Sequence, residues 1–176
     1  MRTVRNANLD DCAAIAAVHV RAWQAAYRGH MPDEFLDRLN IGERTEMWRK
    51  LSVKPGRALL VVDDLDGSIS GFCDLIPSRD ADAKSTTAEI SAIYVSPDKW
   101  GQGIGQKLLS AAEARARGDG FAELTLWVLD ANQRARTFYE KFGFVRDGSS
   151  KEDDRCGDAV IREVRYRKPL DAMANE

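Results

Sequence analysis

The clearest chemical signature is the segment KWGQGIGQKLL, residues 99–109, in which Gly101, Gly103 and Gly105 come directly before a helical pattern of Leu and Ala. The first turn of a helix carries unpaired backbone N–H groups and the positive end of the helix dipole. Because glycines let an anion approach those N–H groups closely, the segment predicts a phosphate cradle. A tight turn from strand to helix without any ligand is an equally good interpretation of the loop alone.

Two common phosphate-binding motifs do not fit this loop. A P-loop ends in Gly-Lys-Ser/Thr, whereas this chain has Gly105-Gln106-Lys107 without a hydroxyl. A dinucleotide fingerprint, G-x-G-x-x-G, counted from Gly101 places Gln106 where the third glycine belongs. The loop therefore belongs to neither class by its spacing.

Elements around the loop are expected to hold it at the end of a strand. Ala88–Val95 is rich in β-branched and aromatic residues and predicts that strand. Ile104, Leu108, Ala112 and Ala116 recur every four residues and predict a helix, and Phe121–Leu129 predicts the next strand. Strand, loop, helix and strand together form a βαβ crossover, so the two strands should be parallel.

The remaining elements follow from hydrophobic periodicity and turn residues. Asp66-Gly67 predicts a hairpin turn, and Asp10 or Asp11 is expected to cap the first helix. We expect Asp130–Gln133 to form a capping box, and Asp147–Asp158 to be an exposed loop. The other predicted strands are Thr3–Arg5, Ala58–Asp63, Ser68–Ile76, Phe144–Arg146 and Ala159–Arg167. Four further helices are predicted: one that ends at Trp23, one that begins at Pro32, one over Glu43–Leu51 and one from Gln133 to Phe142.

Composition narrows the class of protein. A chain of 176 residues suits one domain, 1–176, and a net charge of −2 provides no basic surface for nucleic acid. We expect no membrane span and no secretory signal, hence a cytoplasmic protein. The histidines His19 and His30 and the widely spaced cysteines form no catalytic, disulfide or metal pattern, so no metal is expected; these cysteines are Cys12, Cys73 and Cys156.

Several motifs at matching separations resemble the GCN5-related N-acetyltransferase (GNAT) family. Residues 103–109, GIGQKLL, match the second half of the family's acetyl-CoA loop, Gln/Arg-x-x-Gly-x-Gly/Ala. The segment Asn132-x-x-Ala135-x-x-Phe138-Tyr139-x-x-x-Gly143-Phe144 matches the family's following helix. One departure is that Trp100 occupies the Gln/Arg position. The resemblance is good from Ala58 to Tyr166 and extends in outline to the N-terminal elements.

The resemblance implies an α/β fold with a mixed, mostly antiparallel sheet of about six to seven strands and helices on both faces. The sheet should be splayed near the strands that begin at Ala88 and Phe121. Residues 1–57 would hold the N-terminal strand and the acceptor-side helices, 58–146 the acetyl-CoA-binding core, and 147–176 a loop, the last strand and the tail. A homodimer is common in the family.

Acetyl-CoA is the cofactor that the resemblance implies, with coenzyme A as product. The family binds the pantetheine and acyl carbonyl through main-chain groups, here assigned to Ile93, Tyr94 and Val95. Asn132 and Ala135 are also implied as cofactor contacts, although helix capping explains Asn132 equally well. The implied phosphate cradle comprises Gly101, Gln102, Gly103, Ile104, Gly105 and Gln106.

Acetyl transfer to an amine requires a base, because a lysine-like amine with a pKa of about 10.4 costs roughly 4.6 kcal/mol to deprotonate at pH 7. Glu89, fourteen residues before Gly103, has the spacing of the catalytic glutamate in the family's histone-acetylating members. An ordinary solvated carboxylate is the competing interpretation. Tyr139 matches the family's acid that protonates the departing thiolate, and core packing is its alternative. Trp23 and Tyr27 share a helix face and are candidates for the acceptor site, or for simple helix packing; Asp153 and Asp154 could attract a cationic acceptor.

The sequence thus predicts an acetyl-CoA-dependent N-acetyltransferase acting by direct attack of a primary amine of a small molecule or peptide. A non-catalytic acyl-CoA sensor or interaction domain is the alternative. A nucleotide-binding enzyme is a third possibility, which would require ATP or NAD to bind more tightly than coenzyme A.

Overall fold

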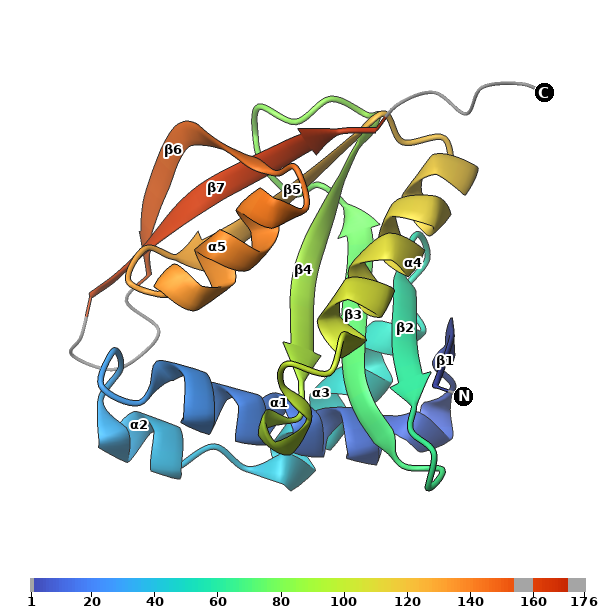
Figure 1. Cartoon of the computed structure of the whole chain (residues 1–176), viewed down its shortest axis with the longest axis vertical. Coiled ribbons are helices and arrows are strands. Elements are labelled where there is room, and N and C mark those ends of the chain that lie inside the picture. Colours follow the sequence, from blue (N-terminus) through green and yellow to red (C-terminus); the bar gives the residue numbers. More distant parts are fainter. Residues whose placement is uncertain (1, 154–159, 171–176) are drawn as a thin grey trace.

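Apolar segments distributed over the whole chain assemble into a single sheet in the computed structural model, which describes residues 2–153 and 160–170 (Figure 1). The strand order is β1-β2-β3-β4-β5-β7-β6, and every neighbouring pair is antiparallel except β4 and β5. The strands are β1 (Thr3–Asn6), β2 (Ala58–Asp63), β3 (Ile69–Pro77), β4 (Thr87–Val95), β5 (Glu123–Leu129), β6 (Val145–Asp153) and β7 (Ile161–Pro169). The predicted mixed sheet is confirmed.

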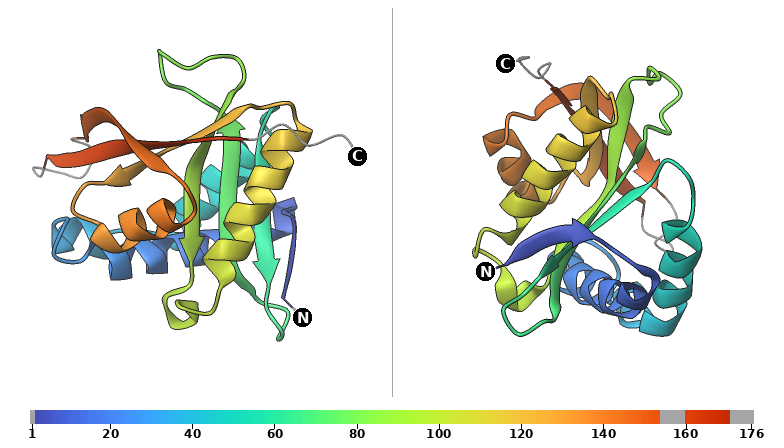
Figure 2. Two further views of the ribbon diagram at one scale, coloured as in Figure 1. Left: turned by 45° about the horizontal axis from the view of Figure 1, so that its top comes forward. Right: turned by 90° about the vertical axis from the view of Figure 1, so that its right-hand side faces the viewer.

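Helices cover both faces of this sheet (Figure 2). Helix α4 (Ile104–Gly118) lies against β2, β3 and β4 on one face, while α1 (Cys12–Tyr27) and α3 (Ile41–Ser52) pack together on the other. The short α2 (Asp33–Asp37) follows α1, and α5 (Gln133–Lys141) lies beside β5 and β7. Within the described residues no helix has the length and apolar character needed to span a membrane.

The splay between β4 and β5 creates the space for a site. The two strands are paired only from Thr87 to Ile90 on β4, opposite Glu123 to Leu126 on β5. The register of β3 against β4 then skips Ser91, which forms a bulge. Ser91 donates a hydrogen bond to the buried Asp74 carboxylate, which also pairs with Arg57. The bulge is therefore held by side chains at the point where the parallel strands part.

Two interpretations made from the sequence are wrong in detail. The stretch from Asp147 to Asp153 is not a loop but most of β6, whose charged side chains pair with β7 through contacts such as Lys151–Glu163. Asn8, rather than Asp10 or Asp11, caps the N-terminal helical segment, because its side chain accepts from the backbone N–H groups of Asp10 and Asp11. The predicted hairpin at Asp66-Gly67 is confirmed, with Gly67 at a φ of 81°.

Candidate active site

One cavity of about 870 Å³ occupies the splay between β4 and β5. Its walls come from α1, β4, the glycine loop, α4, β5, α5 and the β6–β7 pair. All but one of the residues predicted to form the site line it: Trp23, Tyr27, Glu89, Ile93, Tyr94, Val95, Gly101, Gly103, Ile104, Gly105, Gln106, Asn132, Ala135 and Tyr139. The exception is Gln102, whose side chain accepts from Arg2 at 2.6 Å and donates to the Asp98 carbonyl. The fold thus gathers widely separated segments around one space.

The glycine loop forms one end of the cavity. Gly101 and Gly103 have φ angles of 77° and 76°, in the left-handed region that side chains disfavour, and Gly103 is the N-cap of α4. A Cβ on Gly105 would lie 3.3 Å from the Phe138 ring, so this glycine allows α4 and α5 to approach closely. The first backbone N–H groups of α4 therefore open toward the cavity with no side chain as a cap.

Cations surround this end. Lys99 lines the cavity, and its ammonium lies 3.1 Å from the Asp64 carboxylate, which also accepts from Arg2 Nε at 2.8 Å. These hydrogen bonds lower the pKa of Asp64 well below its ordinary value and raise the pKa of Lys99. The N-terminal strand is thereby tied to the glycine loop, and a positive charge is fixed beside it.

Trp100, at the position where the family has Gln or Arg, turns back onto β4. Its indole Nε1 donates to the Val95 carbonyl at 2.8 Å. The guanidinium of Arg134, from the first turn of α5, lies 4.0 Å from the centroid of the Trp100 ring. Arg134 lines the cavity, and the sequence alone did not single it out.

The free edge of β4 forms the middle of the cavity. Ser96 N donates to Ser70 O across the β3–β4 pair. Because antiparallel partners alternate between hydrogen-bonded and non-bonded pairs, the main-chain groups of Ile93 and Val95 point away from β3 toward the splay, and those of Tyr94 point to β3. The main-chain groups of Tyr94 are therefore engaged with β3, and this residue reaches the cavity with its ring.

Helix α5 contributes Asn132 and Tyr139. The Asn132 side chain accepts from Ala135 N at 3.1 Å and caps the helix, so the predicted capping box beginning at Asp130 is replaced by a cap at Asn132. Tyr139 is buried, with 8% exposure, and packs edge-on against Phe138 and Phe144. Burial raises the pKa of Tyr139 well above its usual value, so its hydroxyl remains a proton donor at neutral pH.

Glu89 is not an ordinary solvated residue, because its side chain is only 4% exposed. Its carboxylate accepts from the backbone N–H of Arg79 at 3.1 Å and from the Arg79 guanidinium through both oxygens. The Arg79 side chain is 66% exposed, and hydrogen bonding to Glu89 raises its pKa. Both residues line the cavity, so a buried carboxylate and an accessible guanidinium meet at its wall.

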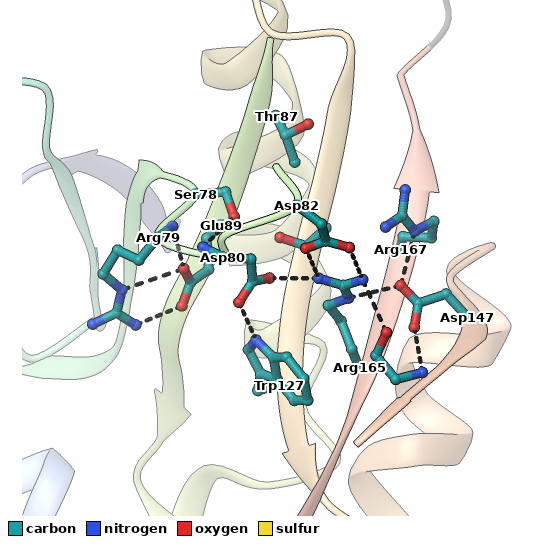
Figure 3. A network of polar contacts seen from close by, with 12 residues as sticks. Ser78, Arg79, Asp80, Asp82, Thr87, Glu89, Trp127, Asp147, Arg165 and Arg167 are labelled. Atoms are coloured by element: carbon teal, nitrogen blue, oxygen red, sulfur yellow. Dashed lines mark hydrogen bonds and ion pairs between the residues drawn. The ribbon is translucent and has the colours of Figure 1, made fainter. Parts of the chain in front are cut away.

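A polar network holds Arg79 in place (Figure 3). The buried Arg165 of β7 binds Asp80 at 3.0 Å, Asp82 at 2.6 Å and Asp147 at 2.7 Å. Trp127 of β5 donates its indole N–H to Asp80 at 3.0 Å. The loop between β3 and β4 is thus anchored to β5, β6 and β7 directly beside Arg79.

The wall of the cavity to which α1 contributes is aromatic. Trp23 and Tyr27 are in edge contact with a centroid distance of 5.2 Å, and Trp23 also contacts Tyr94. His19 stacks on Tyr94 at 5.2 Å and accepts from the Trp48 indole through Nδ1. Trp23 and Tyr27 pack between helices and also face the cavity, so helix packing is confirmed and a contact with the acceptor stays a prediction.

Lys151 and Glu163 line the cavity on the β6–β7 side. The Lys151 ammonium lies 3.3 Å from the Glu163 carboxylate and 4.2 Å from the centroid of the Trp127 ring. No local motif marks Arg79 or Glu163, because each joins the site through strand pairing or a loop contact distant in sequence. Asp154, Arg155 and Cys156 lie outside the described residues, as does the side chain of Asp153.

Cys12 and Cys73 are buried and do not line the cavity, and burial raises the pKa of the Cys73 thiol. Residues 2–153 and 160–170 hold no group of three or more His, Cys, Asp or Glu side chains arranged to bind a metal ion.

Comparisons with known proteins agree with this geometry. The model of the acetyltransferase (GNAT) family matches residues 13–144. The N-acetyltransferase YuaI of Bacillus subtilis (strain 168) is 32% identical over 142 residues, which cover 81% of this chain and 79% of that protein. The L-amino acid N-acyltransferase MnaT of Escherichia coli (strain K12) is 30% identical over 145 residues, covering 81% and 79%. The Salmonella typhimurium acetyltransferase yncA, solved with its cofactor acetyl-CoA, superposes with a TM-score of 0.74 at 23% identity over 100% of this chain and 98% of that chain.

Proposed function

Because the chain belongs to the acetyltransferase (GNAT) family, we propose that it transfers the acetyl group of acetyl-CoA directly to the primary amine of a small molecule bearing both an amine and a carboxylate, such as an L-amino acid. The observation that carries this proposal is a single cavity with the glycine loop at one end and the Arg79–Glu89 pair in its wall. Donor and acceptor sites are thus continuous.

The residues present fit the donor. The opening of α4 offers N–H donors and a positive dipole end to phosphates, and Lys99 adds a fixed charge. The outward main-chain groups of Ile93 and the backbone N–H of Val95 suit an extended chain of amides laid along β4, since the Val95 carbonyl already accepts from Trp100. When bound, acetyl-CoA supplies an activated acyl carbon and a thiolate leaving group.

Two side chains are proposed for proton transfer. Glu89 accepts the proton of the attacking amine, directly or through one water, once the amine reaches the cavity wall. Tyr139 donates its proton to the departing thiolate, and its raised pKa keeps that proton in place at neutral pH. A covalent enzyme intermediate is not needed, because the attack is direct.

The proposed acceptor class is supported by the charged side chains at the Arg79–Glu89 end of the cavity and by the similarity to MnaT, whose name gives an L-amino acid acceptor. Arg79 is accessible and uses Nε and Nη2 for Glu89, so its Nη1 edge is proposed to bind the acceptor carboxylate, while Glu163 beside Lys151 adds negative charge to the same wall for an ammonium group. Trp23 and Tyr27 supply an aromatic wall for the remainder of the molecule.

The test is thiol release from acetyl-CoA with a panel of L-amino acids, polyamines, aminoglycosides and peptides with free N-termini. We expect turnover with amino acids and little with polyamines, which lack a carboxylate. Turnover confined to polyamines would contradict the acceptor class. Tight binding of acetyl-CoA with no turnover on any amine would instead favour the non-catalytic sensor.

Two variants test the assigned roles in the same assay. Glu89→Gln should lower kcat about 100-fold, with the largest loss at acidic to neutral pH where the amine is protonated. Tyr139→Phe should lower kcat about 10- to 100-fold with nearly unchanged acetyl-CoA affinity. An unaltered pH profile in Glu89→Gln, or full activity in Tyr139→Phe, would remove that residue from the mechanism.

A further inference from the structure

Trp100 occupies the Gln/Arg position of the loop motif, and it offers a ligand no hydrogen-bond donor of its own. Its one hydrogen-bond donor, Nε1, is already used by the Val95 carbonyl at 2.8 Å. The indole offers no other polar atom. The loop therefore lacks a side-chain donor at this position.

Arg134 lies where it can supply one. Its guanidinium rests on the Trp100 ring, 4.0 Å from the centroid, and lines the same cavity as Gly101, Gly103 and Gly105. Stacking uses the flat face of the guanidinium and leaves its N–H donors along the edge free for a planar or bidentate anion. Trp100 thus acts as a platform that fixes an arginine from another helix beside the glycine loop.

The neighbouring arginine of the same helix shows the contrast. Arg136 is committed to Asp130 at 3.1 Å and to the Tyr166 hydroxyl at 3.1 Å. Arg134 forms no ion pair with any residue in the part of the chain that the structure describes. A cation that lines a cavity without a carboxylate partner is suited to an anionic ligand.

We propose that Arg134, positioned by the Trp100 ring, binds a phosphate of coenzyme A in place of the Gln/Arg side chain of the loop motif. This rests on the proposed donor, acetyl-CoA. The pyrophosphate and the 3′-phosphate share the required chemistry. Arg134 is the binding residue, and Trp100 is a positioning residue that acts through it.

The experiment measures binding of coenzyme A, 3′-dephospho-coenzyme A and pantetheine by calorimetry, without turnover. Arg134→Gln should weaken coenzyme A binding about 3- to 10-fold, the range for one ordinary hydrogen bond, because the site is exposed. Pantetheine, which has no phosphate, should bind both proteins equally. An equal loss for dephospho-coenzyme A assigns the pyrophosphate, and a loss confined to coenzyme A assigns the 3′-phosphate.

Control variants separate the parts of this arrangement. Lys141→Gln removes an exposed cation at the other end of α5 and should leave affinity unchanged. Trp100→Phe keeps a ring under the guanidinium and should retain most of the affinity, whereas Trp100→Ala should lose as much as Arg134→Gln. The double variant Trp100→Ala/Arg134→Gln should be no weaker than either single variant.

Several results would overturn the proposal. These are an affinity of Arg134→Gln equal to that of the wild type, an equal loss for pantetheine, or additive losses in the double variant. Arg134→Lys keeps the charge and should recover part of the affinity, and far-ultraviolet circular dichroism verifies that each variant folds. If the wild type fails to bind coenzyme A at all, the proposed donor itself is wrong, a result distinct from a variant-specific one.

Discussion

The two ends of the cavity are built in different ways. At the glycine loop, a contiguous stretch from β4 through Gly101 and Gly103 to α4 supplies mostly backbone N–H groups. At the acceptor end, the polar groups are side chains from separate elements, such as Arg79, Glu89 and Glu163. One end is formed by local chain geometry, and the other exists only after the whole sheet has assembled.

This difference predicts how the ends respond to change. Backbone donors are retained in almost any variant, so substitutions at the phosphate end should have small effects, confined to the required glycines and to the Arg134–Trp100 pair. The acceptor end should depend strongly on the residues that hold its segments together. The charged network around Arg165 is the main such group (Figure 3).

The largest effect is expected for Arg165→Met. Removing the buried guanidinium leaves the Asp80 carboxylate without its cationic partner and Asp147 with Arg167 alone, which should lower the free energy of unfolding by about 3 kcal/mol. Release of the loop should also misplace Arg79 and raise the KM for the acceptor. The affinity for coenzyme A should remain close to that of the wild type. Urea denaturation, steady-state kinetics and calorimetry measure the three quantities.

Arg162→Met is the matched control on the same strand. The Arg162 side chain is 59% exposed, and its ion-pair contact with Asp130 is 4.0 Å long, so its loss should cost no more than about 0.5 kcal/mol. If Arg165→Met weakened coenzyme A binding as much as acceptor binding, the two ends would not be independent. The contrast between a phosphate end built by local chain geometry and an acceptor end built by distant side chains would then be wrong.

The same difference explains what the sequence could predict. The strand, glycine loop and helix are specified by neighbouring residues, and the structure confirms them. Arg79 could not be identified, because its position depends on Asp80 meeting Arg165, a residue 85 positions further along the chain. The start of strand β6 was predicted, but its larger part from Asp147 to Asp153 was missed because its polar residues show no apolar alternation; β6 is stabilised by charged pairs with β7, such as Lys151–Glu163.

A smaller effect concerns His19, buried behind the aromatic wall at the acceptor end. Burial, with a further contribution from Arg44, lowers the pKa of His19 to about 3. The unfolded chain, with an ordinary histidine pKa near 6.5, binds the proton more readily, so stability is full above that value and falls as the pH decreases toward 3. When the pH is lowered from 7 to 5, protonation of His19 in the unfolded chain should lower the free energy of unfolding by about 2 kcal/mol.

Urea denaturation at the two pH values measures this slope. His19→Asn keeps an oxygen acceptor for the Trp48 indole and should remove most of the pH dependence, although its stability at pH 7 should be lower because the stacking on Tyr94 is lost. His30→Asn changes an exposed histidine and should leave the slope as in the wild type. An unchanged slope in His19→Asn would show that another group titrates.

The smallest effect should come from the phosphate end, at Gly103→Ala. Gly103 has a φ of 76° with no atom within 4 Å of an added Cβ, so the cost is conformational strain of about 1 kcal/mol. Gly29 has a φ of 83° and equally open surroundings, and Gly29→Ala should therefore lose a similar stability. Only Gly103→Ala should weaken coenzyme A binding, because relief of its strain would turn the first N–H groups of α4 away from the cavity. Equal coenzyme A affinities in the two variants would mean that the phosphates are held by side chains such as Lys99 rather than by the backbone.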